Sequence, residues 1–98
     1  MVVTGRRTPP QDAADLDEQI TFMHAILAAA QRVDDVMGAI TAAESDRAAR
    51  LALMELLDVT GDIADAIAAA PLSTFRADMV AGHRRTLRAL HERRATGD

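Results

Sequence analysis

Apolar residues recur every three or four positions near the start of the chain, and this spacing constrains the fold more than any other feature. Leu16, Ile20, Met23, Leu27 and Ala30 follow one another at intervals of four, three, four and three residues. Such spacing places side chains on one face of an α-helix and does not fit the alternating pattern of a strand. The pattern therefore predicts an amphipathic helix in an all-α fold.

The first helix is expected to be long for so small a protein. It should begin between Asp12 and Asp15, where acidic side chains suit the positive end of the helix dipole, and continue to about Ala43. At about 1.5 Å per residue, such a helix would be a rod of roughly 42 Å. Its apolar stripe shifts after Ala30 and continues at Val33, Met37 and Ile40.

Two capping residues predict two short helices in the middle of the chain. The segment Glu44-Ser45-Asp46 interrupts the first helix, and the hydroxyl of Ser45 can cap a second helix over about residues 46–58. The hydroxyl of Thr60 can cap a third helix that begins at Gly61.

A proline separates the third helix from the last one. Pro71 disfavours helical geometry at the residue before it, so the third helix should end at Ala70. Ser73 or Thr74 can then cap a fourth helix that runs to about Arg94.

The predicted architecture is a long antiparallel helical hairpin capped by two short helices. The hairpin would pair residues 15–43 with residues 74–94, and the two short helices would form its tip. Residues 1–12 contain Gly5 and two prolines and few apolar side chains, so they are expected to form a disordered tail. Residues 13–95 would then make up a single helical domain.

Composition excludes several classes of protein. The chain contains no cysteine, which rules out disulfides and thiolate metal sites. It has no apolar run near 18 residues, so no membrane-spanning helix is expected. The two arginines near the N-terminus are not followed by an apolar stretch, unlike those of a secretory signal. We therefore expect a cytoplasmic protein.

Much of the hydrophobic content is alanine, which buries little area. Hydrophobic residues make up 49% of the chain, yet only two residues are aromatic, both phenylalanine. An alanine-rich helical core is thin and often completes itself by pairing with another chain. The predicted tip carries an apolar cluster of Ile63, Ile67, Leu72 and Phe75, which can close the small core, contact a partner, or do both.

Three segments in the middle of the chain resemble one known family. They read VDDVMGAI over Val33–Ile40, LMELLDV over Leu53–Val59, and IADAIAAAPL over Ile63–Leu72. In order and spacing, the run from Thr21 to about Phe75 is similar to the coiled-coil and C-gate segment of the DNA gyrase A subunit. Within this run, the alanines at 68–70 and Pro71 depart from the family pattern, and the likeness fades after Phe75, where Asp78-Met79 replaces the usual leucine-glutamate pair.

The resemblance implies a detached dimerisation gate without catalysis. The gyrase A subunit cuts DNA with a tyrosine in a domain for which this chain has no room, and the chain has no tyrosine, so no enzyme is expected. The resemblance implies a homodimer, and the gyrase A subunit itself is a possible second partner that the protein would modulate. A free-standing dimeric scaffold is the other version. The expected dimer interface consists of Ile63, Ala66, Ile67, Ala70, Pro71, Leu72 and Phe75.

No metal site, catalytic centre or cofactor is expected from the sequence. His24 has no second histidine or cysteine at metal-ligand spacing near it, and His83 and His91 are too far apart for the i, i+4 pair of a helical zinc site. The carboxylate pairs Asp34–Asp35 and Asp62–Asp65 are ordinary features of a helix surface and of a first turn. Neither pair indicates general acid–base catalysis.

The last helix carries the one basic stretch, over residues 83–94. Arg84, Arg85 and Arg88 are possible phosphate contacts, which would suit a small nucleic-acid-binding or antitoxin-like regulator. The alternative is favourable placement of cations at a helix C-terminus, with pairing to the acidic first helix across the hairpin. The chain is acidic overall and offers no aromatic side chain in this stretch for stacking on bases, so nucleic-acid binding is the less favoured prediction.

Overall fold

Helices account for nearly all of the described chain. The computed structural model describes the backbone of residues 9–97 and the side chains of residues 14–96. Its elements are α1 (Pro9–Gln31), α2 (Val33–Ala42), α3 (Asp46–Leu57), α4 (Gly61–Ala69), the 3-10 helix η2 (Leu72–Phe75) and α5 (Ala77–Gly97). No strand occurs in these residues, which confirms the all-α prediction.

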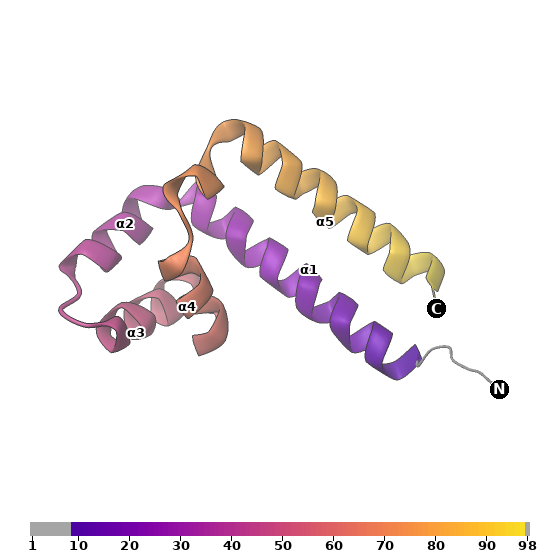
Figure 1. Ribbon diagram of the computed structural model, residues 1–98, viewed down its shortest axis with the longest axis horizontal. Coiled ribbons are helices and arrows are strands. Elements are labelled where there is room, and N and C mark those ends of the chain that lie inside the picture. Colours follow the sequence, from indigo (N-terminus) through magenta and orange to yellow (C-terminus); the bar gives the residue numbers. More distant parts are fainter. Residues whose placement is uncertain (1–8, 98) are drawn as a thin grey trace.

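The two longest helices lie side by side and run in opposite directions (Figure 1). Helices α2, α3 and α4, which we call the helix cluster, gather at the end of this pair where α1 finishes and α5 begins. The molecule measures 55 × 28 × 19 Å and has a radius of gyration of 16.1 Å. A compact chain of this length has a radius of gyration of about 13 Å. The fold is therefore elongated.

The prediction of one unbroken helix from residue 15 to residue 43 is wrong. The chain bends at Arg32, whose φ of −128° and ψ of 36° are not helical, and α2 leaves the axis of α1 (Figure 1). The bend has a tertiary cause. Helix α2 packs against α3, while α3 and α4 also contact α1, and a straight rod cannot make both sets of contacts. The predicted long hairpin capped by two short helices is therefore not confirmed; α5 packs mainly against α1.

The predicted N-caps of the two central helices are confirmed. The hydroxyl of Ser45 accepts a hydrogen bond from the backbone N–H of Ala48 at 3.0 Å. The hydroxyl of Thr60 accepts one from the backbone N–H of Ile63 at 3.5 Å. Between the two helices, Asp58 adopts a left-handed conformation with a φ of 56°, which aspartate tolerates better than most residues.

The start of the last helix differs from the prediction. Helix α4 ends at Ala69, and Ala70 is extended before Pro71, as the proline dictates. Ser73 and Thr74 do not cap α5, because they lie inside η2. Helix α5 begins at Ala77 instead, and its first turn is closed by a hydrogen bond from the backbone N–H of Val80 to the carbonyl oxygen of Arg76 at 2.8 Å.

The first helix begins earlier than its acidic residues indicate. Most of the predicted tail, residues 1–8, lies outside the described residues, whereas residues 9–12 belong to α1. A proline is well accepted in the first turn of a helix, because its missing N–H would have no partner there. The two prolines therefore mark the start of α1 rather than the end of a tail.

The main core lies where the second half of α1 meets the helix cluster. Its buried residues are Ala25, Ile26, Ala29, Val36, Leu53, Ala64 and Ile67. A second buried pair, Ile20 and Leu90, lies on the two hairpin helices. Four of the ten buried hydrophobic residues among the described side chains are alanines. Small side chains let the helices approach closely but remove little apolar area from water, so the core is thin.

Candidate interaction surface

The predicted dimer interface divides into buried and exposed residues. Ile67 is 1% exposed and belongs to the core of its own chain, so its side chain offers no surface to a second copy. Ile63 and Phe75 are half-buried and pack against the same core. Ala66 and Ala70 are also half-buried. Only Pro71 and Leu72 are exposed, so any contact must be centred on them.

Residues 71–79, which we call the linker segment, comprise the connection from the helix cluster to α5 and the first three residues of α5 itself. The proline ring fixes φ at −66° at Pro71, and the carbonyl oxygen of Pro71 accepts a hydrogen bond from the backbone N–H of Thr74 at 2.9 Å. The Nε2 atom of His83 lies 3.0 Å from the carbonyl oxygen of Thr74, which accepts its hydrogen bond and ties the segment to α5. These bonds make the linker segment an ordered turn.

An exposed ion pair follows this turn. The guanidinium of Arg76 donates to the carboxylate of Asp78, with the Nε atom 2.6 Å from one carboxylate oxygen. This hydrogen bond lowers the pKa of Asp78 and raises the pKa of Arg76. Because the pKa of Asp78 is lowered in the folded state, the contribution of the pair to stability is lost as the pH falls through that pKa. Both side chains are more than half exposed, so this contribution is small.

Apolar side chains of the linker segment reach solvent. Leu72 is 63% exposed and Met79 is 40% exposed. Elsewhere in the described part of the chain, only Leu51 on α3, at 52%, is a comparably large and exposed hydrophobic residue. Two of these three residues therefore fall within the nine residues of the linker segment.

The arginines of α5 differ in whether a carboxylate pairs with them. Arg94 forms an ion pair with Asp17 of α1, so the expected pairing across the hairpin is present. Arg84, Arg85 and Arg88 are exposed, and none of them has a carboxylate partner within the described residues. Their exposure is compatible with the predicted phosphate contacts, and it is equally compatible with a solvated helix face.

The two hairpin helices bring two histidines together. The ring centroids of His24 on α1 and His91 on α5 are 5.6 Å apart, and the ring planes meet at 61°. Both residues are exposed. No spacing rule indicates this pair, because the two residues lie near opposite ends of the sequence. Only the antiparallel packing of α1 and α5 makes them neighbours.

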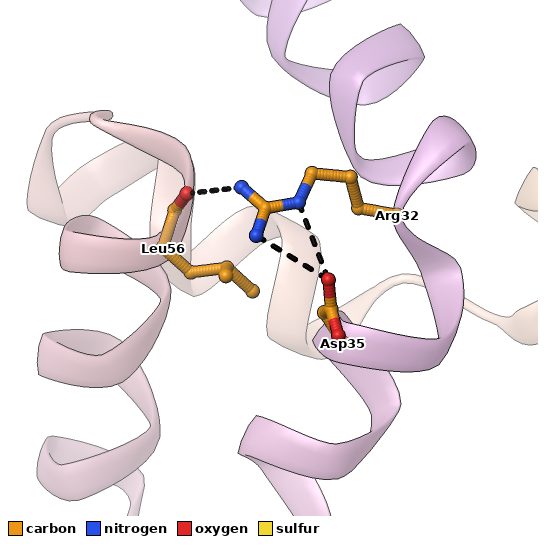
Figure 2. A network of polar contacts seen from close by, with 3 residues as sticks. All are labelled: Arg32, Asp35 and Leu56. Carbon is orange, nitrogen blue, oxygen red and sulfur yellow. Dashed lines mark hydrogen bonds and ion pairs between the residues drawn. The ribbon is translucent and has the colours of Figure 1, made fainter.

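Arg32 joins the bend of the chain to the end of α3 (Figure 2). Its guanidinium donates to the carbonyl oxygen of Leu56 at 2.9 Å and to the carboxylate of Asp35 at 3.3 Å. The carbonyl of Leu56 is one of the last in α3 and has no partner within that helix. Arg32 therefore caps α3 from the bend between α1 and α2. An open groove of about 540 Å³ lies beside it, lined by Arg32, Asp35, Ala39, Ala52, Glu55 and Leu56.

Replacing Arg32 with glutamine is expected to lower the free energy of unfolding by about 0.5–1.5 kcal/mol. The variant loses the bond to Leu56, and the value is modest because the Arg32 side chain is 47% exposed. Urea unfolding followed by circular dichroism measures this loss in the free energy of unfolding. Arg47→Gln, on the exposed surface of α3, is the matched control and should change stability by less than about 0.5 kcal/mol. Equal losses in both variants would contradict a capping role for Arg32.

Two further features of the described residues bear on function. None of their helices is both long and apolar enough to cross a membrane. They also contain no group of three or more histidine, cysteine, aspartate or glutamate side chains placed to hold a metal ion. What the described surface does present is an apolar turn, a basic helix face and a histidine pair.

Comparison of the chain with protein families, with curated proteins and with solved structures gives no match.

Proposed function

We propose that this chain is a non-catalytic association module that forms a homodimer through its linker segment, with Pro71 and Leu72 at the centre of the contact. The exposure of Leu72 carries the proposal: its side chain is 63% exposed beside an exposed proline. Burying a leucine against a second chain is favourable, whereas leaving it in water gains nothing. Single exposed leucines are common on protein surfaces, so the surroundings of Leu72 also matter.

Those surroundings favour association. Met79, in the same segment, is a second large apolar side chain in water, and Ile63 and Phe75 keep part of their surface exposed. The core of a single chain is thin and rich in alanine. Burial of apolar area between chains gains roughly 25 cal/mol per Å² before the entropy costs of pairing are subtracted. A second copy of the chain supplies such area without any other partner.

The proposal extends to the gyrase A subunit as a second partner. The three segments that resemble the C-gate fall on α2, on the end of α3, and on α4 with the start of the linker segment. They are the parts of the chain that form the helix cluster and its exposed turn. A module that carries gate-like segments would take the place of one of the two gyrase A subunits that meet at the gate. Modulation of gyrase in the cytoplasm would follow from such an exchange.

Sedimentation of the pure protein, alone and mixed with the gyrase A subunit of its own organism, tests this proposal. A new mixed species that is absent with Leu72→Glu would support gate-directed modulation, and supercoiling assays would follow. A stable homodimer that ignores gyrase would support a free-standing scaffold and end the gyrase part of the proposal. A monomer that also ignores gyrase would overturn both parts.

Nucleic-acid binding through α5 is a second candidate. The observation that favours it is the exposure of Arg84, Arg85 and Arg88 without carboxylate partners in the described residues. Phosphate contacts release counterions, so affinity for duplex DNA should fall steeply as salt rises and should be lost in the triple glutamine variant. No binding to duplex DNA at low salt would remove this candidate.

A further inference from the structure

His24 of α1 and His91 of α5 bring two imidazole rings into contact on the surface of the hairpin. The two rings come from different helices and meet edge to face across the hairpin, with centroids 5.6 Å apart. Both side chains are exposed, so an ion from solvent can reach them. The contact has no evident part in the core, because neither residue belongs to the buried cluster.

The distance between the rings suits two imidazoles that share one ion. Metal–nitrogen bonds of about 2.0–2.1 Å place the centroids of two rings on one ion roughly 4.5–6.4 Å apart, from a right-angled to a linear arrangement of the ligands. The observed 5.6 Å lies inside this range, and the tetrahedral arrangement falls near its middle. Small rotations of two exposed side chains can therefore aim a nitrogen of each ring at a common point.

We propose that His24 and His91 form a cross-helix site for a divalent transition-metal ion such as Zn²⁺, Ni²⁺ or Cu²⁺. Neutral imidazole is a preferred ligand of these ions, whereas Mg²⁺ and Ca²⁺ prefer oxygen. The described residues supply no group of three or more candidate ligands, so water fills the remaining positions. The site is open, and it binds more weakly than a closed structural zinc site.

Metal at this site joins α1 to α5. Apart from the short η2, α5 contacts the rest of the fold mainly through α1, so a bridge between the two helices holds α5 in place. An ion that binds the folded chain and not the unfolded chain stabilises it by mass action. In a protein with a thin core, the effect should be visible in thermal unfolding.

The test is thermal unfolding and isothermal titration calorimetry of the full chain with Ni²⁺ or Zn²⁺ chloride, in a preparation without a polyhistidine tag. We expect about one ion bound per chain. We also expect Tm to rise by roughly 10 °C or more when the free metal is about 100 times its Kd. Mg²⁺ at the same concentration should have no such effect.

Three variants decide whether the pair is responsible. His24→Gln and His91→Gln should each abolish the shift in Tm, while their stability without metal stays close to that of the unmodified chain because both residues are exposed. His83→Gln is the matched control: it removes the histidine that bonds to Thr74, and it should keep the metal shift whatever its own Tm.

Two results would overturn the proposal. One is a metal-dependent shift that survives in both His24→Gln and His91→Gln, which would place the ion elsewhere. The other is the absence of a shift in the unmodified chain, in which case the histidines make only an edge-to-face contact between rings.

Discussion

Leu53→Ala is expected to lower the free energy of unfolding by about 2–5 kcal/mol, the range for a buried leucine truncated in a packed core. Leu53 is 0% exposed and lies on α3 among core residues of α1, α2 and α4. Several of its neighbours in the core are alanines, which cannot extend into the cavity that the change leaves. A small domain has only about 5–15 kcal/mol of stability in total, so this variant should lose a large share of it.

Urea unfolding followed by circular dichroism measures this loss, and the same helix provides the control. Leu51→Ala removes the same atoms two residues away, where the side chain is 52% exposed. It should change the free energy of unfolding by less than about 0.5 kcal/mol. If Leu53→Ala were as stable as Leu51→Ala, the placement of the core around α3 would be wrong.

Leu72→Glu is expected to weaken homodimer formation by about 30-fold or more, which corresponds to the loss of roughly 2 kcal/mol at a central interface residue. The variant places a charge where the proposed dimer excludes water, and such a charge is costly unless it is paired. Because Leu72 is 63% exposed in the single chain, the change should leave the helix content and Tm of the monomer unaltered.

Gel filtration over a range of concentrations compares this variant with the unmodified chain. Leu51→Glu is the matched control, since it introduces the same charge at an exposed leucine outside the proposed contact. It should leave the dimer intact. If Leu51→Glu disrupted association and Leu72→Glu did not, the contact would lie on α3 rather than on the linker segment.

Local signals predicted the ends of the central helices well. Ser45 and Thr60 have hydroxyls that suit an N-cap, and both of them accept the expected hydrogen bonds. Pro71 ends α4 because its ring restricts the residue before it. Each of these effects acts within a few residues of the chain, so no knowledge of the tertiary structure was needed to anticipate it.

The bend at Arg32 could not be predicted in the same way. Arginine has a high helix propensity, and neither proline nor glycine lies at the break. The shift of the apolar stripe at Val33 was its only sign in the sequence, and a shifted stripe is also compatible with a gently rotating straight helix. The bend is instead favoured by the contacts of α2 with α3, together with the hydrogen bond from Arg32 to the end of α3.

The candidate sites show the same division between local and tertiary information. The sequence identified the apolar residues near Pro71 but could not separate Ile67, which fills the core, from Leu72, which reaches solvent. Both fit the same pattern of aliphatic residues near a helix end. The histidine pair was missed entirely, because His24 and His91 meet only through the packing of α1 against α5.

Sedimentation equilibrium of the untagged full chain tests the central claim most directly, with a chelator present so that metal cannot bridge two chains. The proposed homodimer predicts an average mass that rises from one chain towards two as concentration increases, while Leu72→Glu stays near one. A mass of one chain at every concentration up to about 1 mM would leave less than about 4 kcal/mol for the contact and would contradict the claim.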